Sequence, residues 1–264
     1  MRILFTVQGD GRGHMTQAIA AAQILEEAGH DVVAVTVCVS PGRAIPAFFR
    51  RAFAEGLVPI SSPGFSLRGA RGVAAFRTWW TAMRGLGGYR RSLATLRELI
   101  ERRQPDVIVN FLEPLLGAFN LLHPHPIPVV SVGPHFMLDH AEFVRSPRFR
   151  FQQWLMRRYV RLAGARSTRL ALSFYPAASL PERRLVVGPP LLRRELFDLT
   201  PDEPGRFLLA YVLNQGYTED ILCWHRAHPD IEVHCFCEKP KVQPVWHYDA
   251  TLAFHGLDGS KFLR

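Results

Sequence analysis

A histidine at the end of a glycine-rich turn has the clearest chemical potential in this chain. The segment Gln8-Gly9-Asp10-Gly11-Arg12-Gly13-His14 follows the apolar run 2–7 and precedes a helical pattern that starts at Met15. Glycines let the backbone approach a ligand closely, and the N–H groups of a first helical turn attract anions. Because an imidazole titrates near neutral pH, His14 suits a general base or a phosphate contact. A capping or packing histidine is the alternative interpretation.

Neighbouring residues of the same turn extend this hypothesis. Gly11 and Gly13 would let backbone N–H groups face a phosphate. Arg12 is placed to pair with a phosphate of a substrate. Thr16 would either cap the helix or contact the same phosphate.

Two further sets of polar residues follow predicted strands. Asn110-Phe111-Leu112-Glu113-Pro114 ends one strand, and His135 and His140 follow the next. Open α/β sheets bind ligands at the carboxyl edge of their strands. We therefore expect Glu113 to accept a proton from a substrate hydroxyl or to bind that hydroxyl, with help from Asn110. A helix cap at Glu113 and ordinary loop histidines are the alternatives.

The spacing of the glycines argues against several common sites. In G-x-G-x-x-G the third glycine stands three residues after the second, where this chain has His14. The second strand also has no acidic residue at its end to bind a ribose. The hydrolase motif G-x-S-x-G and the P-loop motif are both absent from the sequence. The histidine and aspartate spacing over 135–140 matches no known metal-ligand pattern, so we expect no metal.

The elements that must position these side chains follow an alternating pattern. Apolar runs alternate with helical patterns, which predicts an α/β protein with a Rossmann-like parallel sheet and helices on both faces. The expected strands are 2–7, 31–37, 57–60, 106–111, 127–132, 170–174 and 185–188. The expected helices are 15–29, 43–54, 70–102 (broken at Gly85-Leu86-Gly87-Gly88), 114–122, 147–163 and 176–180.

A second, shorter α/β pattern follows a polar linker. It contains a strand over 206–213, a helix over 218–227 and strands over 231–237 and 250–254. We therefore expect an N-terminal Rossmann-like domain over 1–192, a linker over 193–205 and an incomplete second Rossmann-like domain over 206–264.

The segment Gln8–Thr16 resembles the N-terminal loop of GT-B glycosyltransferases, in particular the lipid-linked cell-wall N-acetylglucosaminyl transferases and related bacterial nucleotide-sugar transferases. Leu185-Val186-Val187-Gly188-Pro189-Pro190-Leu191 resembles the segment that closes their N-terminal domain, and the order of elements also fits. The resemblance implies transfer of a hexose or N-acetylhexosamine from a nucleotide diphosphate sugar, with UDP favoured, to a hydroxyl acceptor. A lipid-linked acceptor is among the options. No cofactor besides the donor substrate is implied.

The same resemblance implies a role for each of the candidate residues. His14 or Glu113 would take the proton of the acceptor, while the glycine loop and Thr16 would bind phosphate. Asn214 and Gln215, after the first strand of the second domain, would lie on the donor side, although they depart from the Gly-Ser-rich loops of some relatives. The acceptor pocket would be lined by Asn110, His135 and His140.

The chain departs from this family in its second domain. Only about 60 residues follow the linker, and the glycine- and glutamate-bearing motif that grips the donor is missing. We therefore expect a protein truncated in its C-terminal domain. A nucleotide-sugar 2-epimerase of the same fold and a non-catalytic accessory domain that binds a partner stay open.

The composition and the positive charge of the chain bear on which partners it binds. The formal net charge is +9, and residues 145–169 contain eight arginines, four aromatic residues and no acidic residue. Arginine with tryptophan on an amphipathic helix favours an anionic membrane surface. A bias toward arginine alone is the alternative, and no motif supports nucleic acid. With no signal peptide or membrane-spanning run, the sequence predicts a cytoplasmic protein, with peripheral contact at the inner membrane as an option.

Overall fold

The computed structural model describes residues 1–39, 44–63, 67–68, 72–73, 80, 83–144, 147–199, 205–212, 217–237 and 245–256. The chain divides into two compact units. Unit 1 comprises Met1–Gly64 and Trp79–Arg194, and unit 2 comprises Phe65–Thr78 and Glu195–Arg264.

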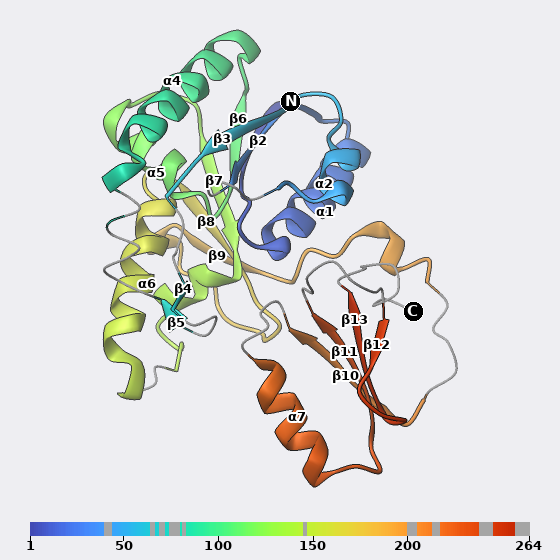
Figure 1. Ribbon diagram of the computed structural model, residues 1–264. Helices are drawn as coiled ribbons and strands as arrows, with labels where there is room; N and C mark the ends of the chain where they lie inside the picture. Colours follow the sequence, from blue (N-terminus) through green and yellow to red (C-terminus); the bar gives the residue numbers. More distant parts are fainter. Residues whose placement is uncertain are drawn as a thin grey trace. The chain divides into compact units, whose positions relative to one another are not determined.

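Unit 1 is built on a seven-stranded sheet with strand order β3-β2-β1-β6-β7-β8-β9, in which every neighbouring pair is parallel (Figure 1). All seven strands expected from the sequence are present, with ends that differ by a few residues. Their bounds are β1 Arg2–Gln8, β2 Asp31–Val39, β3 Leu57–Ser61, β6 Val107–Phe111, β7 Val129–Gly133, β8 Thr168–Leu172 and β9 Leu185–Gly188. The predicted Rossmann-like parallel sheet is confirmed.

Helices cover both faces of this sheet. Helices α1 (Arg12–Glu27) and α2 (Ala47–Ala52) lie on one face, and α4 (Leu86–Arg103), α5 (Pro114–Leu122) and α6 (Arg150–Ala163) lie on the other (Figure 1). The alternation of strand side chains explains the two cores. Phe5 packs with Met15 and Phe49 on the first face, whereas Leu4 packs with Leu96 and Leu116 on the second. Because both faces are covered, β1 is an unbroken buried run rather than an alternating one.

Short 3-10 turns complete unit 1 and its exit. They are η1 Pro134–Asp139, η2 Pro147–Phe149, η3 Pro181–Arg183 and η4 Arg194–Leu196. Among the described residues, none of the helices combines the length and the apolar character that crossing a bilayer would need.

One helix prediction is wrong, and another is correct only in part. Residues 176–180 form no helix, because the Ala178 carbonyl accepts a bond from His140 and the Ser179 hydroxyl accepts one from Val187 N, which hold the segment open. The helix expected over 70–102 is present only in part: residues 80 and 83–84 are helical, Gly85 is a turn at the expected break, and α4 follows from Leu86. Within its first part, Gly72–Val73 instead forms β5, which pairs antiparallel with β4 (Leu67–Arg68) in unit 2.

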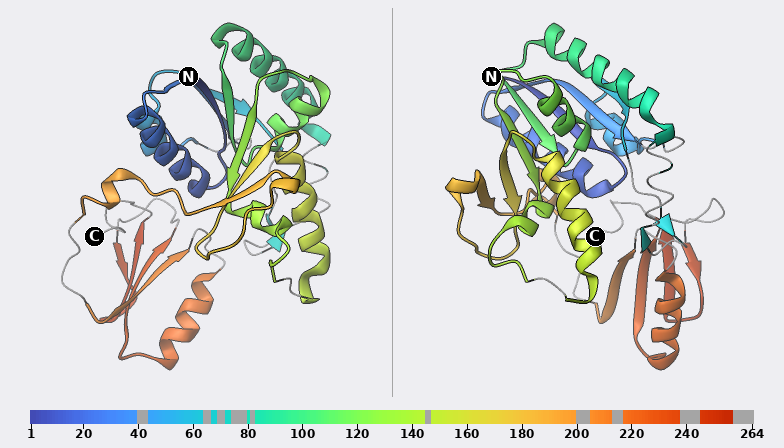
Figure 2. Two further views of the ribbon diagram at one scale, coloured as in Figure 1. Left: turned by 180° about the vertical axis from the view of Figure 1, so that it is seen from behind. Right: turned by 90° about the vertical axis from the view of Figure 1, so that its left-hand side faces the viewer.

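Unit 2 contains a four-stranded sheet of order β10-β11-β13-β12, with α7 along one face (Figures 1 and 2). Its elements are β10 Phe207–Val212, α7 Thr218–Ala227, β11 Glu232–Cys237, β12 Val245–His247 and β13 Leu252–Gly256. The antiparallel β12 was not expected from the sequence. Cys235 and Cys237 are buried against α7 beside Leu222, as small apolar side chains of a core.

Candidate active site

The order of the strands in unit 1 reverses between β1 and β6. Chain order runs outward to β2 and β3 on one side of this point and to β7, β8 and β9 on the other. Ligands of open α/β sheets bind outside the carboxyl ends of the strands at such a reversal. The loop after β1 carries His14, and the segment after β6 carries Glu113, so both candidates flank the expected position.

The first glycine of the loop, Gly9, lies where there is no room for a side chain. Gly9 N donates to the Cys38 carbonyl at 2.7 Å, and a Cβ at Gly9 would lie 2.7 Å from Val39 Cγ1. The loop is therefore pressed against the end of β2. Helix α1 then begins at Arg12 with Gly11 as an extended N-cap that has no side chain to bond the first-turn N–H groups. An anion placed there would take the role that a capping side chain usually has.

His14 lies in the first turn of α1, against a second histidine. Its ring centroid is 5.4 Å from that of His135, which lies in η1 directly after β7. The Nδ1 atoms of both rings are buried and have no hydrogen-bond partner among the described residues. Buried polar atoms of native proteins almost always have partners, so these two nitrogens, on rings whose centroids lie 5.4 Å apart, are candidates for contact with a ligand.

Burial also fixes the protonation state of this pair. It lowers the pKa of His14 to about 4, with the charge of His135 as the second cause, whereas the Gln17 side chain next to the ring opposes the shift. Burial lowers the pKa of His135 as well. At neutral pH both rings are uncharged, which makes His14 a proton acceptor rather than a cation that holds a phosphate.

The other loop residues take more ordinary positions. The Arg12 guanidinium lies over the Phe48 ring, 5.9 Å from its centroid. The Thr16 hydroxyl donates to the Gly13 carbonyl at 2.8 Å within the helix, so it does not cap the helix terminus. Gly13 is exposed and Gly11 half-buried, which leaves the backbone of this turn open to a ligand.

Glu113 is fully buried and serves as the N-cap of α5. Its Oε1 accepts bonds from Leu115 N at 2.9 Å and from the Ser62 hydroxyl. Burial raises the pKa of Glu113 to about 7, although both of these bonds oppose the shift. Its Oε2 has no partner among the described residues, and no hydrogen bond described joins it to His14. The helix-cap alternative is thus realised, and the nearby Cys38 thiol also acts to lower the pKa of the carboxyl group.

Asn110 organises the backbone around this carboxylate. Its Oδ1 accepts from Glu113 N at 2.8 Å, and its Nδ2 donates to the Ala163 carbonyl at 2.7 Å. The Thr6 hydroxyl also donates to Asn110 Oδ1, at 3.0 Å. Asn110 therefore bridges β1, β6 and α6 in the interior. Its amide groups are used within the protein, so none remains to bind an acceptor substrate.

His140 differs from the other two histidines because both ring nitrogens are used. Its Nδ1 accepts from Glu142 N at 3.2 Å, and its Nε2 donates to the Ala178 carbonyl at 2.8 Å. It is 1% exposed. The expected role in an acceptor pocket is not supported by this geometry, and His140 instead pins residues 176–180 to the end of η1.

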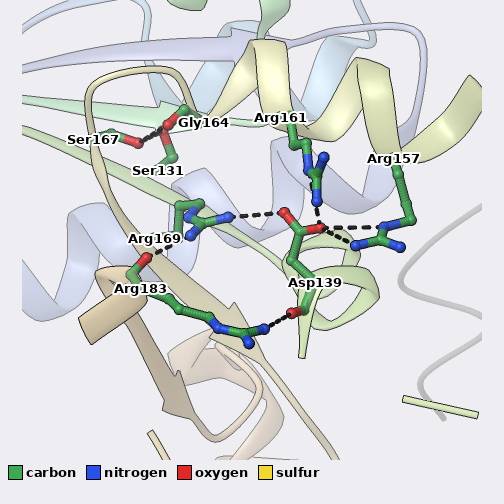
Figure 3. A network of polar contacts seen from close by, with 8 residues as sticks. All are labelled: Ser131, Asp139, Arg157, Arg161, Gly164, Ser167, Arg169 and Arg183. Atoms are coloured by element: carbon green, nitrogen blue, oxygen red, sulfur yellow. Dashed lines mark hydrogen bonds and ion pairs between the residues drawn. The ribbon is translucent and has the colours of Figure 1, made fainter. Parts of the chain in front are cut away.

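Asp139 is an organising residue that the sequence reasoning did not single out (Figure 3). Its buried carboxylate is paired with Arg157 at 3.1 Å, Arg161 at 3.3 Å and Arg169 at 2.9 Å. Arg183 donates to the Asp139 carbonyl at 3.4 Å. The spacing of Arg157 and Arg161 by one helical turn was the available signal. This network ties η1, which carries His135, to α6, β8 and η3.

Asn214 and Gln215 lie outside the described residues. Within the described ranges, no three histidine, cysteine, aspartate or glutamate side chains gather as a metal site would require.

Comparison with protein-family models decides the family. Residues 1–237 match the model of glycosyl transferase family 1. The chain belongs to this family. No curated protein sequence matches it.

Solved structures show the same fold at low identity. A glycotransferase of kitacinnamycin is 18% identical with a TM-score of 0.56, over 96% of this chain and 70% of that one. Arabidopsis thaliana UGT89C1 complexed with UDP is 14% identical with a TM-score of 0.55, over 99% and 72%. The UDP-GlcNAc 2-epimerase of Neisseria meningitidis bound to UDP-GlcNAc is 11% identical with a TM-score of 0.58, over 100% and 74%. The chain is thus a glycosyltransferase of the GT-B fold.

Proposed function

We propose that this glycosyltransferase moves a hexose or N-acetylhexosamine from a UDP-type sugar to a hydroxyl acceptor, with His14 as the base. More specifically, we propose that the acceptor is linked to a lipid at the cytoplasmic face of the inner membrane. The observation that carries the proposal is the neutral, buried His14 with an unpartnered Nδ1 at the start of α1.

The proposed step is a direct displacement. The acceptor hydroxyl oxygen bonds to the anomeric carbon, the bond from that carbon to the diphosphate oxygen breaks, and its electron pair stays on the diphosphate. The hydroxyl proton passes to His14, whose pKa rises when a negative diphosphate lies near it. The N-terminus of α1, which has no side-chain cap, would stabilise the negative charge that develops.

We propose a structural role for Glu113. Its carboxyl group is 1% exposed and already bonds Ser62 and Leu115 N, so it shapes the backbone after β6. We therefore assign the proton transfer to His14 alone. His135, whose ring contacts His14, is the residue best placed to keep the base neutral and oriented.

The test is a pair of measurements on the wild type and on His14→Gln. Calorimetric titration with UDP, GDP and their sugars measures donor binding, and incorporation of labelled sugar into a lipid extract measures transfer. We expect His14→Gln to keep nucleotide binding within about threefold and to lose transfer by roughly 10²–10⁴-fold, the usual contribution of a general base. His247→Gln, on the exposed strand β12, is the matched control.

Three results would redirect the proposal. Normal turnover by His14→Gln would remove His14 from the chemistry. Conversion of the nucleotide sugar without any acceptor would support a 2-epimerase, as the Neisseria meningitidis protein is named. Nucleotide binding with no turnover by the wild type would support a non-catalytic accessory domain.

A further inference from the structure

Helix α6 presents a strongly cationic face. Residues 147–163 contain five arginines and no acidic residue. At 100° per residue, Arg150, Trp154, Arg158 and Arg161 fall on one side of the helix, and all four are exposed. Val160 and Ala163 fall on the opposite side and are buried in the core. The charge is therefore concentrated on the outward face of an amphipathic helix.

Aromatic and aliphatic side chains are exposed beside these arginines. Phe151 and Trp154 are 63% and 57% exposed, and their rings stack with centroids 6.0 Å apart. Phe149 is half exposed and lies under the Arg148 guanidinium. Just before η2, Val144 is 88% exposed. So much exposed apolar surface on one segment of a soluble fold usually marks an interaction site.

A groove runs between the arginines. Its volume is about 440 Å³, and its lining comprises Pro147, Arg150, Gln153, Trp154, Arg157, Arg158 and Arg161. Arg157 and Arg161 are held in place by the buried carboxylate of Asp139 (Figure 3). That carboxylate also binds Arg169, so three guanidinium charges surround its one negative charge. The surplus positive charge is fixed in position before any ligand arrives.

We propose that this surface, Val144 with Pro147–Arg161, binds an anionic phospholipid bilayer. The guanidinium groups would contact the phosphates of lipid headgroups, and the rings of Phe149, Phe151 and Trp154 would enter the interfacial layer. Arginine pairs well with phosphate, and an amphipathic helix with a cationic face and bulky apolar residues lies in the plane of a membrane surface. The exposed Val144 and phenylalanines distinguish a bilayer from a soluble phosphate, which would leave them in water.

The surface is joined to the candidate active site through a short path. Asp139 ends η1, and His135 lies four residues earlier in the same turn. A bilayer bound at α6 would therefore hold the η1 end of the sheet near lipid-linked acceptors. This last step rests on the proposed function, whereas bilayer binding itself does not.

Co-sedimentation with vesicles tests the proposal on the full chain. We expect binding to vesicles of phosphatidylcholine with 30% phosphatidylglycerol, and little binding to phosphatidylcholine alone. Arg150→Gln with Arg158→Gln leaves intact the three arginines that pair with Asp139. Each arginine near an anionic surface contributes roughly fivefold to binding, so this variant is expected to bind roughly 25-fold more weakly. Phe151→Ala with Trp154→Ala is expected to weaken binding to the same vesicles.

Matched variants separate charge from folding. Arg90→Gln with Arg91→Gln removes the same charge from the exposed side of α4 and is expected to bind within about twofold of the wild type. Arg150→Lys with Arg158→Lys keeps the charge and is expected to retain most of the binding. Calorimetric titration with UDP reports on the donor side, so loss of vesicle binding with intact UDP binding separates this proposal from the proposed function.

Several outcomes would overturn the proposal. Equal binding to neutral and anionic vesicles would do so, as would equal losses in the α4 and α6 glutamine variants. Full competition by millimolar inorganic phosphate would assign the groove to a soluble anion. Tighter binding to a single-stranded RNA than to vesicles, lost in the same α6 variant, would assign the surface to nucleic acid.

Discussion

Two buried titratable groups, at the N-termini of α1 and α5, have pKa values that burial shifts in opposite directions. Burial lowers the pKa of His14 to about 4 and raises that of Glu113 to about 7. Unfolded His14 takes a proton below pH ~6.5 while the folded form does not, so its contribution to stability is lost as pH falls from ~6.5 to 4. Folded Glu113 holds a proton that the unfolded form releases above pH 4.5, so its contribution is lost as pH rises from 4.5 to about 7.

The two slopes oppose each other between pH 5 and 6.5, which leads to a prediction for single variants. Relative to the wild type, Glu113→Gln should gain unfolding free energy with rising pH, and His14→Gln should lose it, each by about 1 kcal/mol per pH unit. Urea unfolding at half-unit pH steps measures both. The double variant serves as control and should follow the wild-type slope. Single variants parallel to the wild type would show that neither pKa is shifted.

Among the secondary-structure elements, the sequence predicted all seven strands of unit 1 but was less reliable for the segments that connect them. Runs such as Ile3–Val7 are apolar because both faces of a parallel sheet are covered, and that signal is local. The segment 176–180 failed because tertiary bonds from His140 and Val187 N hold it open, and such bonds leave no periodic trace.

In the candidate site, too, some features were predictable from the sequence and others depend on tertiary packing. The glycine loop and the residues after each strand were predictable, because parallel strands bring their carboxyl ends to one edge. The contact between His14 and His135 depends on the close approach of α1 and η1, which spacing alone does not specify. The capping of α5 by Glu113 and the saturation of His140 are likewise products of packing.

Helices α5 and α6 pack so closely that one glycine decides their separation. A Cβ at Gly117 would lie 1.7 Å from the Leu162 carbonyl oxygen, on the backbone of the facing helix. Because backbone does not yield as a side chain does, Gly117→Ala should destabilise the fold by about 3 kcal/mol, at the upper end of overpacking. Chemical denaturation measures the loss.

Gly87 provides the matched control for this prediction. It is also helical, in the first turn of α4, but a Cβ there would meet nothing within 4 Å. Gly87→Ala should therefore gain about 0.5 kcal/mol from helix propensity. Equal effects of the two substitutions would mean that propensity, not the α5–α6 contact, sets the result.

At the scale of the whole molecule, the composition and the second sheet act in opposite directions on association. The net charge of +9 keeps copies apart at low ionic strength. Strand β10 is the end strand of its sheet in the described part of the chain, and Phe207, Leu208 and Leu209 on it are each 44–46% exposed. An apolar strand at the edge of a sheet is a template for pairing with another chain.

We therefore predict self-association through β10 that strengthens with salt. The repulsion is screened over about 8 Å at 0.15 M ionic strength, while strand pairing and apolar contact are not weakened. Sedimentation velocity over a range of protein concentrations should show larger species at 0.15 M salt than at 0.01 M. Leu209→Lys places a charge on the edge and should restore the monomer, whereas Leu122→Lys, at an exposed position of α5, should not. If both variants associate as the wild type does, another surface brings the copies together, and β10 is then protected by its own unit.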